Sequence, residues 1–378
     1  MLSLVLIVAS VLIVVIVAMI FRIGSLVSKV KQPAQGIVGT SNKINAAMWL
    51  GFLIFGTIAA VWSYMVARKD FLPEASATQG KEVDYLFWVT MTILVVVFLV
   101  THVLLFYFPY RYQYREENKA RFFPDNNKLE IAWTVVPAIV LTMLVFSGWK
   151  VWRDITREAP KDAVVVEVVG KQFNWLVRYP GKNDNQLGQY NFKLIDDNKG
   201  NELGLDMTDE ASFDDFTALQ VHVPKGKPVL FRIRARDVLH SFSIPHFRMK
   251  MDAVPGMPTK FWCTPTKTTA EMRAELNNPD FNYEVACQEI CGRGHFSMRL
   301  ILIVEEEDEY NKWYAEQKSW LSSHQEYLEM VPANLKEKAI KAMELPAEEA
   351  AALLKKYNNP LEAESPSIVK VSTEAAIK

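Results

Sequence analysis

The stretch CQEICGRGHFSM, residues 287–298, places two cysteines, a histidine and a methionine within a dozen positions. Three residues separate Cys287 from Cys291, three more separate Cys291 from His295, and two separate His295 from Met298. Thiolate, thioether and imidazole groups are soft ligands that select copper over hard cations. We therefore expect a loop whose side chains converge on a metal ion, with at least one further ligand from elsewhere in the chain.

The two cysteines taken alone would also fit a disulfide or a zinc site. The pair could form a disulfide in an oxidising compartment, and two cysteines with two histidines could form a closed tetrahedral zinc site. Met298 and Glu289 favour copper over both, because a thioether is a poor zinc ligand but a common weak axial copper ligand, and because a glutamate between the cysteines has no role in a disulfide.

The missing histidine lies upstream in DVLHSFSIPHFRMKMDAVPG, residues 237–256, where His240 follows a strand-like apolar run that begins at Val229. The two motifs DxLHSF and CxExCGxGHxxM together resemble subunit II of the haem-copper cytochrome oxidases, which carries the binuclear copper centre CuA. The resemblance covers residues from about 85 to about 305. Asp237 is expected to organise the His240 loop through local hydrogen bonds.

The resemblance implies a complete ligand set for two copper ions. It makes Cys287 and Cys291 the bridging thiolates, His240 and His295 the terminal ligands, Met298 the axial sulfur and the carbonyl of Glu289 the opposite axial ligand. The Glu289 side chain would also bind magnesium at the boundary with subunit I, which Asp252 would approach as well. Two bridging thiolates let both coppers share one unpaired electron, so each changes geometry little on reduction.

Four apolar segments predict membrane helices at residues 2–21 and at about 46–66, 86–108 and 130–152. Each is long enough to span a hydrocarbon layer of about 30 Å. The first lacks a basic region before it and a clear cleavage site after it, which favours a retained helix over a signal peptide. Loops 22–45 and 109–128 are rich in Lys and Arg, which predicts that both are cytoplasmic. The expected location is a bacterial inner membrane, with both termini and the copper domain on the periplasmic side.

The segments divide the chain into four predicted parts. Residues 85–152 form the helix hairpin typical of subunit II, and residues 1–84 add a helix pair that the family usually lacks. That pair could pad the rim of the oxidase or could dock a neighbouring respiratory complex. Residues 153–305 form the copper domain, and residues 306–378 form a helical or partly disordered extension, either binding a partner or exposed to solvent.

Short alternating runs separated by Gly, Pro and Asn predict an all-β, cupredoxin-like domain with antiparallel strands. The runs expected to form strands are AVVVEVVG, FNWLVRYPG, LQVHVPKG, PVLFRIRAR, TAEMRAEL and MRLILIV. The polar segment 182–216 is expected to be a long surface loop. Acids could steer a basic cytochrome c, although such runs are more often solvated faces. The candidates are Asp209, Glu210, Asp214, Asp215 and the run from Glu305 to Glu309.

Two further sites depend on the resemblance. Glu130, at the start of the fourth apolar segment, would lie at the cytoplasmic mouth of a proton path into subunit I, or would simply remain in water at the membrane edge. Phe173 and Trp175 occupy the aromatic cluster through which the family accepts electrons, with Phe173 standing where a tryptophan is expected. The alternative is that both are ordinary strand aromatics.

The remaining candidates are assigned structural roles. His102, His222 and His246 are expected to pack or to form hydrogen bonds, and Cys263 to be a small buried side chain. The sequence contains no CxxCH motif for a covalently bound haem. With a single histidine in its apolar segments, the chain is not expected to bind haem or to reduce oxygen alone.

The predicted function is electron uptake by a proton-translocating cytochrome c oxidase. Electrons would pass from cytochrome c, or from a cytochrome c domain, through the two coppers to haem a in subunit I. The expected partners are subunits I and III and the membrane, and no nucleic acid. The alternatives are a subunit II-like protein of a quinol oxidase, which would lack the ligands, and a CuA protein docked to a different respiratory complex. A copper-storage protein would not need Glu130 or the aromatic cluster, and nitrous oxide reductase would bring a much larger catalytic domain.

Overall fold

The computed structural model describes residues 2–30, 40–68, 71–115, 119, 121–182 and 185–358. It divides into two compact units: one contains residues up to Phe71 with Met91–Pro137, and the other contains Leu72–Thr90 together with the chain from Ala138 onward. The last twenty residues of the predicted extension lie outside the described part of the chain. The bounds of the four predicted parts stay predictions.

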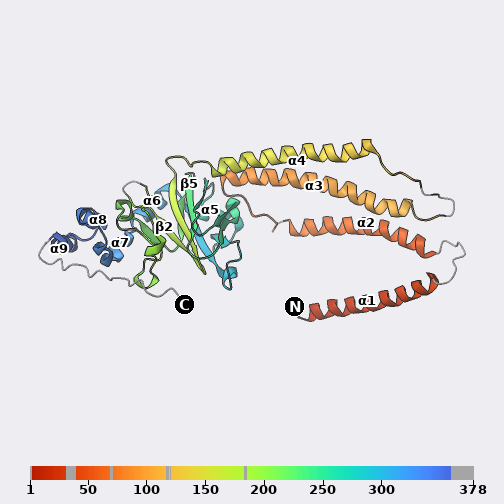
Figure 1. Cartoon of the computed structure of the whole chain (residues 1–378), viewed down its shortest axis with the longest axis horizontal. Coiled ribbons are helices and arrows are strands. Elements are labelled where there is room, and N and C mark those ends of the chain that lie inside the picture. The colour runs from red at the N-terminus through yellow and green to blue at the C-terminus, as the bar shows by residue number, and fades with distance from the viewer. Residues whose placement is uncertain are drawn as a thin grey trace, which may run out of the picture. The chain divides into compact units, whose positions relative to one another are not determined.

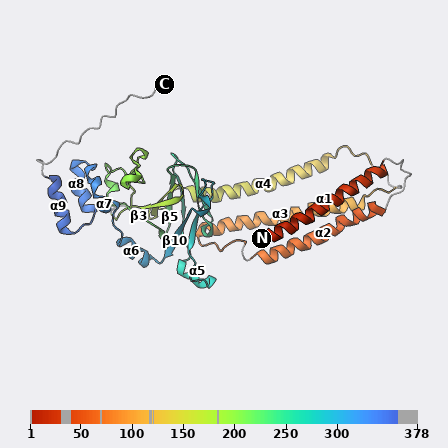
Figure 2. The same cartoon turned by 90° about the horizontal axis from the view of Figure 1, so that it is seen from below.

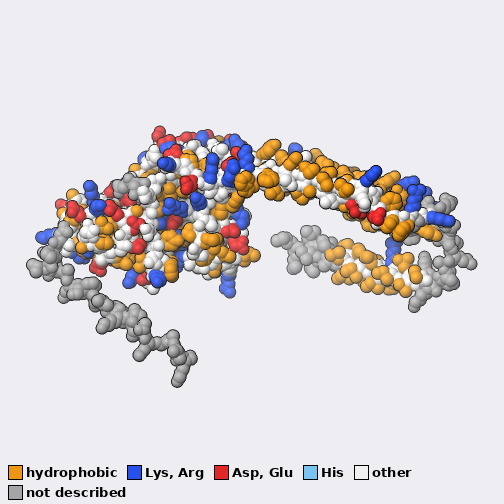
Figure 3. All heavy atoms as spheres, turned by 45° about the horizontal axis from the view of Figure 1, so that its top comes forward, with side chains coloured by type: hydrophobic (Ala, Val, Ile, Leu, Met, Phe, Trp, Pro, Cys, Tyr) orange, Lys and Arg blue, Asp and Glu red, His pale blue; other side chains and the backbone are white. Residues whose placement is uncertain are grey.

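Four long apolar helices confirm the predicted membrane segments (Figure 1). They are α1 Leu2–Val30, α2 Thr40–Ala67, α3 Thr78–Arg111 and α4 Asn127–Thr156. On the face shown in Figure 3, hydrophobic side chains cover most of the described parts of these helices, and Lys and Arg gather near helix ends. Exposed apolar side chains of this kind are suited to lipid contact.

Two five-stranded sheets form the β-domain, which confirms the predicted cupredoxin-like class. The first has the order β3-β2-β1-β5-β8 and the second β4-β10-β9-β6-β7. Their bounds are β1 Val164–Lys171, β2 Asn174–Tyr179, β3 Phe216–Ala218, β4 Val221–Pro224, β5 Val229–Ala235, β6 His240–Ile244, β7 Met249–Ala253, β8 Thr259–Cys263, β9 Tyr283–Cys287 and β10 Arg299–Glu305. Strand pairs β1–β5 and β4–β10 are parallel, so the expectation of a wholly antiparallel scaffold is wrong.

The alternation of apolar residues explains the main core of this domain. Val166, Val168 and Phe231 from the first sheet and Phe242 and Val285 from the second are fully buried in one cluster. Because neighbouring strand residues point to opposite faces, each run can supply one apolar face to the space between two sheets. The core therefore supports the strands from which the candidate ligands project.

The run TAEMRAEL forms helix α5, Thr269–Leu276, so its assignment to a strand is wrong. Thr268 caps the helix: its hydroxyl accepts a hydrogen bond from the Glu271 N–H at 3.0 Å, and the Glu271 carboxylate accepts one from the Thr268 N–H at 2.7 Å. This reciprocal capping box, followed by good helix formers, outweighs the weak alternation in the run.

The extension after β10 is helical as predicted, but it packs against the β-domain instead of standing apart from it. It contains α6 Glu307–Ala315, α7 Trp320–Ser323, α8 Lys336–Ala342 and α9 Ala347–Asn358. Figures 1 and 2 show α7 to α9 beside the part of the domain that carries β2 and β3. The sequence predicted an extension that either binds a partner or is exposed to solvent. It did not predict that the extension packs against the β-domain.

Segment 182–216 is not simply a surface loop, which corrects the sequence-based expectation. Its buried side chains Leu203, Leu205, Met207 and Phe213 join residues of the C-terminal helices in what we call the second core. The contributors from the C-terminal extension are Trp320, Leu321, Tyr327, Leu328, Val331, Ala339, Ile340 and Met343. Asp215, proposed as a steering acid, is fully buried and cannot face a partner.

Candidate metal centre

The candidate ligands come from two adjacent strands and one loop. His240 is the first residue of β6, and Cys287 is the last residue of β9, which pairs with β6 through Phe242 and Cys287. The loop that follows β9 carries Cys291 and His295 and returns to Met298, whose carbonyl accepts a hydrogen bond from the Cys287 N–H at 3.1 Å. Closing the loop at its base brings its side chains back to the end of β9.

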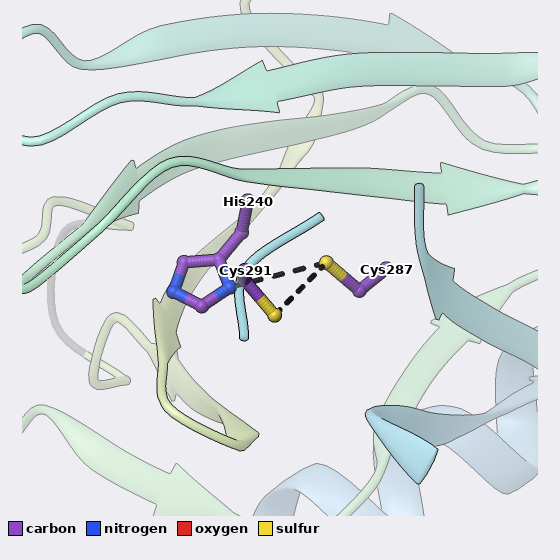
Figure 4. A group of neighbouring side chains, drawn as sticks. All are labelled: His240, Cys287 and Cys291. Atoms are coloured by element: carbon purple, nitrogen blue, oxygen red, sulfur yellow. Dashed lines mark hydrogen bonds between the residues drawn. The ribbon is translucent and has the colours of Figure 1, made fainter. Parts of the chain in front are cut away.

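The donor atoms lie within contact distance of one another. The sulfurs of Cys287 and Cys291 are 3.9 Å apart, and Nδ1 of His240 is 3.9 Å from the Cys287 sulfur. Figure 4 shows the imidazole of His240 and both sulfurs directed toward one point. On the other side, the Cys291 sulfur lies 3.7 Å from Nδ1 of His295 and 3.8 Å from Sδ of Met298.

The two sulfurs are too far apart for a disulfide bond and close enough to share a metal ion. A disulfide bond is about 2.05 Å long, whereas these sulfurs are 3.9 Å apart. Metal–thiolate bonds are about 2.3 Å long, so both sulfurs can bind the same ion. With a carbonyl oxygen, that of Glu289, 3.3 Å from the Cys287 sulfur, the donor set fits a soft metal.

The site is closed to water on its inner side. His240 is fully buried, and Cys287, Cys291 and Met298 are almost so. Burial and the neighbouring Cys287 sulfur raise the pKa of the Cys291 thiol to about 11. A cation that binds between the sulfurs must therefore displace protons, as thiolate-bound metals do.

Asp237 fixes the orientation of His240, as predicted. Its Oδ1 lies 2.8 Å from Nε2 of His240, so a proton on Nε2 leaves Nδ1 free to face the sulfurs. Partial burial opposes ionisation of Asp237, but hydrogen bonds from the Gln172 N–H, His240 and the Val238 N–H hold its pKa below the usual value. The carboxylate thus serves as a fixed acceptor behind the imidazole.

Gln172 connects both halves of the site, a role that sequence reasoning missed. Its side-chain amide donates to the carbonyl of Cys291 at 2.7 Å, and its backbone N–H donates to Oδ2 of Asp237 at 2.6 Å. The turn between β1 and β2 therefore supports the cysteine loop and the His240 loop together. The only signal in the sequence is that Gln172 is a polar side chain within the aromatic run GKQFNWLVRYPG, at the turn.

The two aromatic candidates occupy different environments. Trp175 is buried, and its ring centroid lies 5.9 Å from that of His240. Phe173 is partly exposed and covers the backbone of the cysteine loop, since a Cβ placed on Gly294 would lie 2.5 Å from its Cγ. Gly292 and Gly294 thus permit a close approach that any larger residue would block.

The other predicted site side chains are not among the clustered donors. Asp252, on β7, is exposed and pairs with Lys250 at 3.0 Å, and the side chain of Glu289 is also exposed. Glu130 lies in the first turn of α4, in the other compact unit, where its carboxylate accepts from the Asn126 N–H at 3.5 Å. The roles proposed for these three side chains stay predictions.

His102, His222 and His246 and the third cysteine have the structural surroundings that were predicted. His222 stacks on Trp313 and lies 3.1 Å from Glu305, while His246 packs edge-on against Phe281 and Tyr283. His102 packs against Phe98 and Phe106 within α3. Cys263 is fully buried in the main core. In the described part of the chain, the tight cluster of His, Cys, Asp and Glu donors is the one formed by His240, Cys287 and Cys291.

Comparison with known families gives two adjacent matches. Residues 60–151 match the family described as cytochrome c oxidase subunit II, transmembrane domain, and residues 164–305 match cytochrome c oxidase subunit II, periplasmic domain. The second match contains every candidate ligand.

Individual relatives carry the same description. The alternative cytochrome c oxidase subunit 2 of Bradyrhizobium diazoefficiens is 36% identical over 242 residues, which cover 63% of this chain and 79% of the relative. Cytochrome c oxidase subunit 2 of Thermostichus vulcanus is 27% identical, with 72% and 85% covered. A solved periplasmic domain of subunit II, from Bradyrhizobium japonicum, is 22% identical over 42% of this chain and 95% of its own, with a TM-score of 0.28.

Proposed function

Because the chain belongs to the cytochrome c oxidase subunit II family, we propose that it is the subunit that accepts electrons from cytochrome c. The proposed centre contains two copper ions. Its ligands are Cys287 and Cys291 as bridges, His240 and His295 at the two ends, Met298 and the Glu289 carbonyl. The observation that carries this proposal is the symmetry of the donor set, with one imidazole beside each of two buried sulfurs that are 3.9 Å apart.

A pair of copper ions held by two thiolates would supply one-electron chemistry with an electron shared between both ions. The protein contributes rigidity. Asp237 holds the His240 ring, Gln172 holds the carbonyl of Cys291, and the Cys287 N–H closes the loop onto Met298. Ligands fixed by a supporting layer of hydrogen bonds reorganise little when the charge of the site changes, which favours fast transfer.

The outer side of the site supports a docking face for the electron donor. Ile290 and Phe296 of the cysteine loop are 84% and 82% exposed, and Leu239, which precedes His240, is 50% exposed. Phe173, which lies against Gly292 and Gly294 of the loop, is 37% exposed. Apolar side chains that surround a buried redox site can bring a partner close without a charged group between the two. We assign Phe173 to the contact with cytochrome c and Trp175 to the layer between that face and His240.

Steering by acidic residues has weaker support. Three acids of the run already have partners within the chain: Glu305 pairs with His222, Glu306 with Lys225 and Glu307 with Lys227. Their charges are therefore less available to a cytochrome. Glu210 likewise pairs with Lys338 at 2.8 Å. We therefore expect apolar contact, more than charge, to decide how tightly the donor binds.

The complete enzyme requires other subunits. We propose that electrons leave for haem a in subunit I, where oxygen is reduced and protons are pumped, and that subunit III completes the complex in a bacterial inner membrane. Glu289 and Asp252 would face the subunit I boundary, with Glu289 sharing a magnesium ion, and Glu130 would begin a proton path. A quinol oxidase subunit has no use for this donor set, and the alternative docking of the extra helices to another respiratory complex stays open.

The electron paramagnetic resonance spectrum of the oxidised, copper-loaded full chain tests this proposal. We expect a multiline mixed-valence signal from one electron shared by two copper nuclei, and two coppers per chain by elemental analysis. A single-copper pattern, or no uptake of copper, would refute the binuclear assignment. Apo protein loaded with zinc provides the control for non-specific thiol binding.

A further inference from the structure

The residues that precede α3 are fastened to the β-domain through their backbone. We call residues 72–77 the strap. The Ser76 N–H donates to the carbonyl of His246 at 2.7 Å, and the Ser76 carbonyl accepts from the Thr266 N–H at 2.9 Å. Ser76 and Ala77 are fully buried. A segment that comes before the membrane hairpin in the sequence is thus part of the folded copper domain.

Arg248 joins the strap, α3 and the β-domain at one point. Its Nε and Nη2 donate to the two oxygens of Asp84, in the second turn of α3, at 2.6 and 3.0 Å. Its Nη1 donates to the carbonyl of Pro245 at 2.7 Å, and Nη2 also donates to the carbonyl of Pro73. The side chain of Arg248 is 9% exposed and that of Asp84 22%. A bidentate pair of this kind fixes direction as well as distance.

These contacts reach the strand that carries a candidate ligand. Strand β6 begins at His240 and continues into the short helix Pro245–Phe247. In that helix, the His246 carbonyl accepts the hydrogen bond from the Ser76 N–H of the strap. Gly80 of α3 packs against the same short helix, since a Cβ placed on it would lie 3.3 Å from the Phe247 carbonyl. One end of β6 thus holds the ligand, and the other is pinned to the first turns of α3.

We propose that the strap and the Asp84–Arg248 pair form a positioning device that fixes the metal centre relative to the first turns of α3. Its role is to hold the distance over which the electron leaves the centre. That role rests on the proposed function; the mechanical role does not. Because electron transfer slows steeply with distance, a small loosening of this joint would slow the outgoing step while the metal ligands remain untouched.

Amide hydrogen exchange on the full chain in detergent tests the mechanical role. Asp84→Asn removes the charge and keeps the size, and we expect exchange at Ser76 and Thr78 to rise by about tenfold, as for one lost charge-assisted hydrogen bond. Glu82→Gln, at an exposed acid in the same helix turn, is the matched control and should leave exchange unchanged. Arg248→Lys, which keeps the charge but loses the fork, provides a second variant if Asp84→Asn fails to fold.

Flash photoreduction of the assembled oxidase with a ruthenium complex tests the positioning role. We expect Asp84→Asn to keep the copper spectrum and the rate of copper reduction, and to slow the outgoing transfer at least about threefold. If amide exchange at Ser76 and Thr78 is unchanged in both Asp84→Asn and Arg248→Lys, the pair does not hold the strap to the β-domain. If exchange rises but the rate of electron transfer out of the copper centre is unchanged, the positioning role is wrong. A missing dicopper signal in the wild-type chain would instead refute the proposed function and leave the exchange result interpretable.

Discussion

The cysteine loop and the second core lie in the same compact unit, yet their sequences reveal them to very different degrees. The loop places Cys287, Cys291, His295 and Met298 within a dozen residues, so its composition alone indicates soft-metal chemistry. The second core joins segment 182–216 to helices more than a hundred residues later, and neither part is strongly apolar by itself. A metal site can thus be predicted from a short stretch of sequence, whereas a packing surface can be predicted only when it is known which distant segments come together.

Buried charges tie segment 182–216, which contributes to the second core, to the first sheet. Arg178 donates to Glu167 at 2.7 Å and to Asp215 at 2.9 Å, while Arg234 donates to Glu167 at 3.0 Å. Arg178 also donates to the carbonyl of Gly188 in segment 182–216. Despite the cost of burial, the charges of Arg178 and Arg234 hold the pKa of Glu167 at about 2. This network ties segment 182–216 to β1, β2 and β5.

The largest expected effect is confined to the loop. Cys291→Ser should abolish the mixed-valence copper signal, because a hydroxyl cannot replace a bridging thiolate. Cys263→Ala, at the buried cysteine outside the loop, should retain the full signal. Copper content and electron paramagnetic resonance measured on both variants would check this, and a retained shared-electron signal in Cys291→Ser would remove that residue from the centre.

Breaking the charge network should have the next largest effect. Arg178→Met should lower the free energy of unfolding by about 3–5 kcal/mol, because two buried carboxylates lose a partner. Arg299→Met, at an exposed arginine 3.6 Å from Glu284, is the control and should cost less than about 1 kcal/mol. Urea unfolding of the full chain measures both. If both variants lost the same free energy of unfolding, the buried charge network would stabilise the fold no more than an exposed ion pair does.

Truncation within the second core should separate packing from metal chemistry. Leu321→Ala should destabilise the chain by about 3 kcal/mol, because it leaves a cavity at a fully buried position. Leu219→Ala, at a leucine that is 95% exposed, should be nearly neutral. Both variants should keep the copper spectrum. A changed spectrum in Leu321→Ala alone would mean that the second core supports the site after all.

The network also predicts a dependence of stability on pH. Burial, which outweighs the attraction of Arg178, raises the pKa of Asp215 to about 7. The folded state therefore retains a proton that the unfolded chain has lost, so this group favours folding at low pH and loses that contribution as pH rises through 7. Between pH 5 and pH 8 the wild type should lose about 2 kcal/mol relative to Asp215→Asn. Urea titrations at four pH values would reveal it, and parallel pH profiles would contradict it.

The smallest expected effect concerns the support of the loop. Gln172→Ala removes the donor to the Cys291 carbonyl and should cost about 1 kcal/mol of stability. It should also alter the copper hyperfine pattern while copper remains bound. Gln288→Ala, at an exposed glutamine beside Cys287, is the matched control. Identical spectra for Gln172→Ala and wild type would restrict Gln172 to a purely structural contact.

The sequence alone predicted the four apolar helices and most strands of the β-domain, because these follow from apolar periodicity, and its ligand spacing indicated soft-metal chemistry. It misassigned TAEMRAEL because the capping contribution of Thr268 and Glu271 outweighs a weak alternation. Gln172, the strap and the second core depended on the tertiary structure. Their partners are distant in sequence, as Gln172 and Cys291 or Asp84 and Arg248 are. Hydrogen-bonding and packing capacities are local properties of a residue, but only the folded chain decides which capacities are brought together.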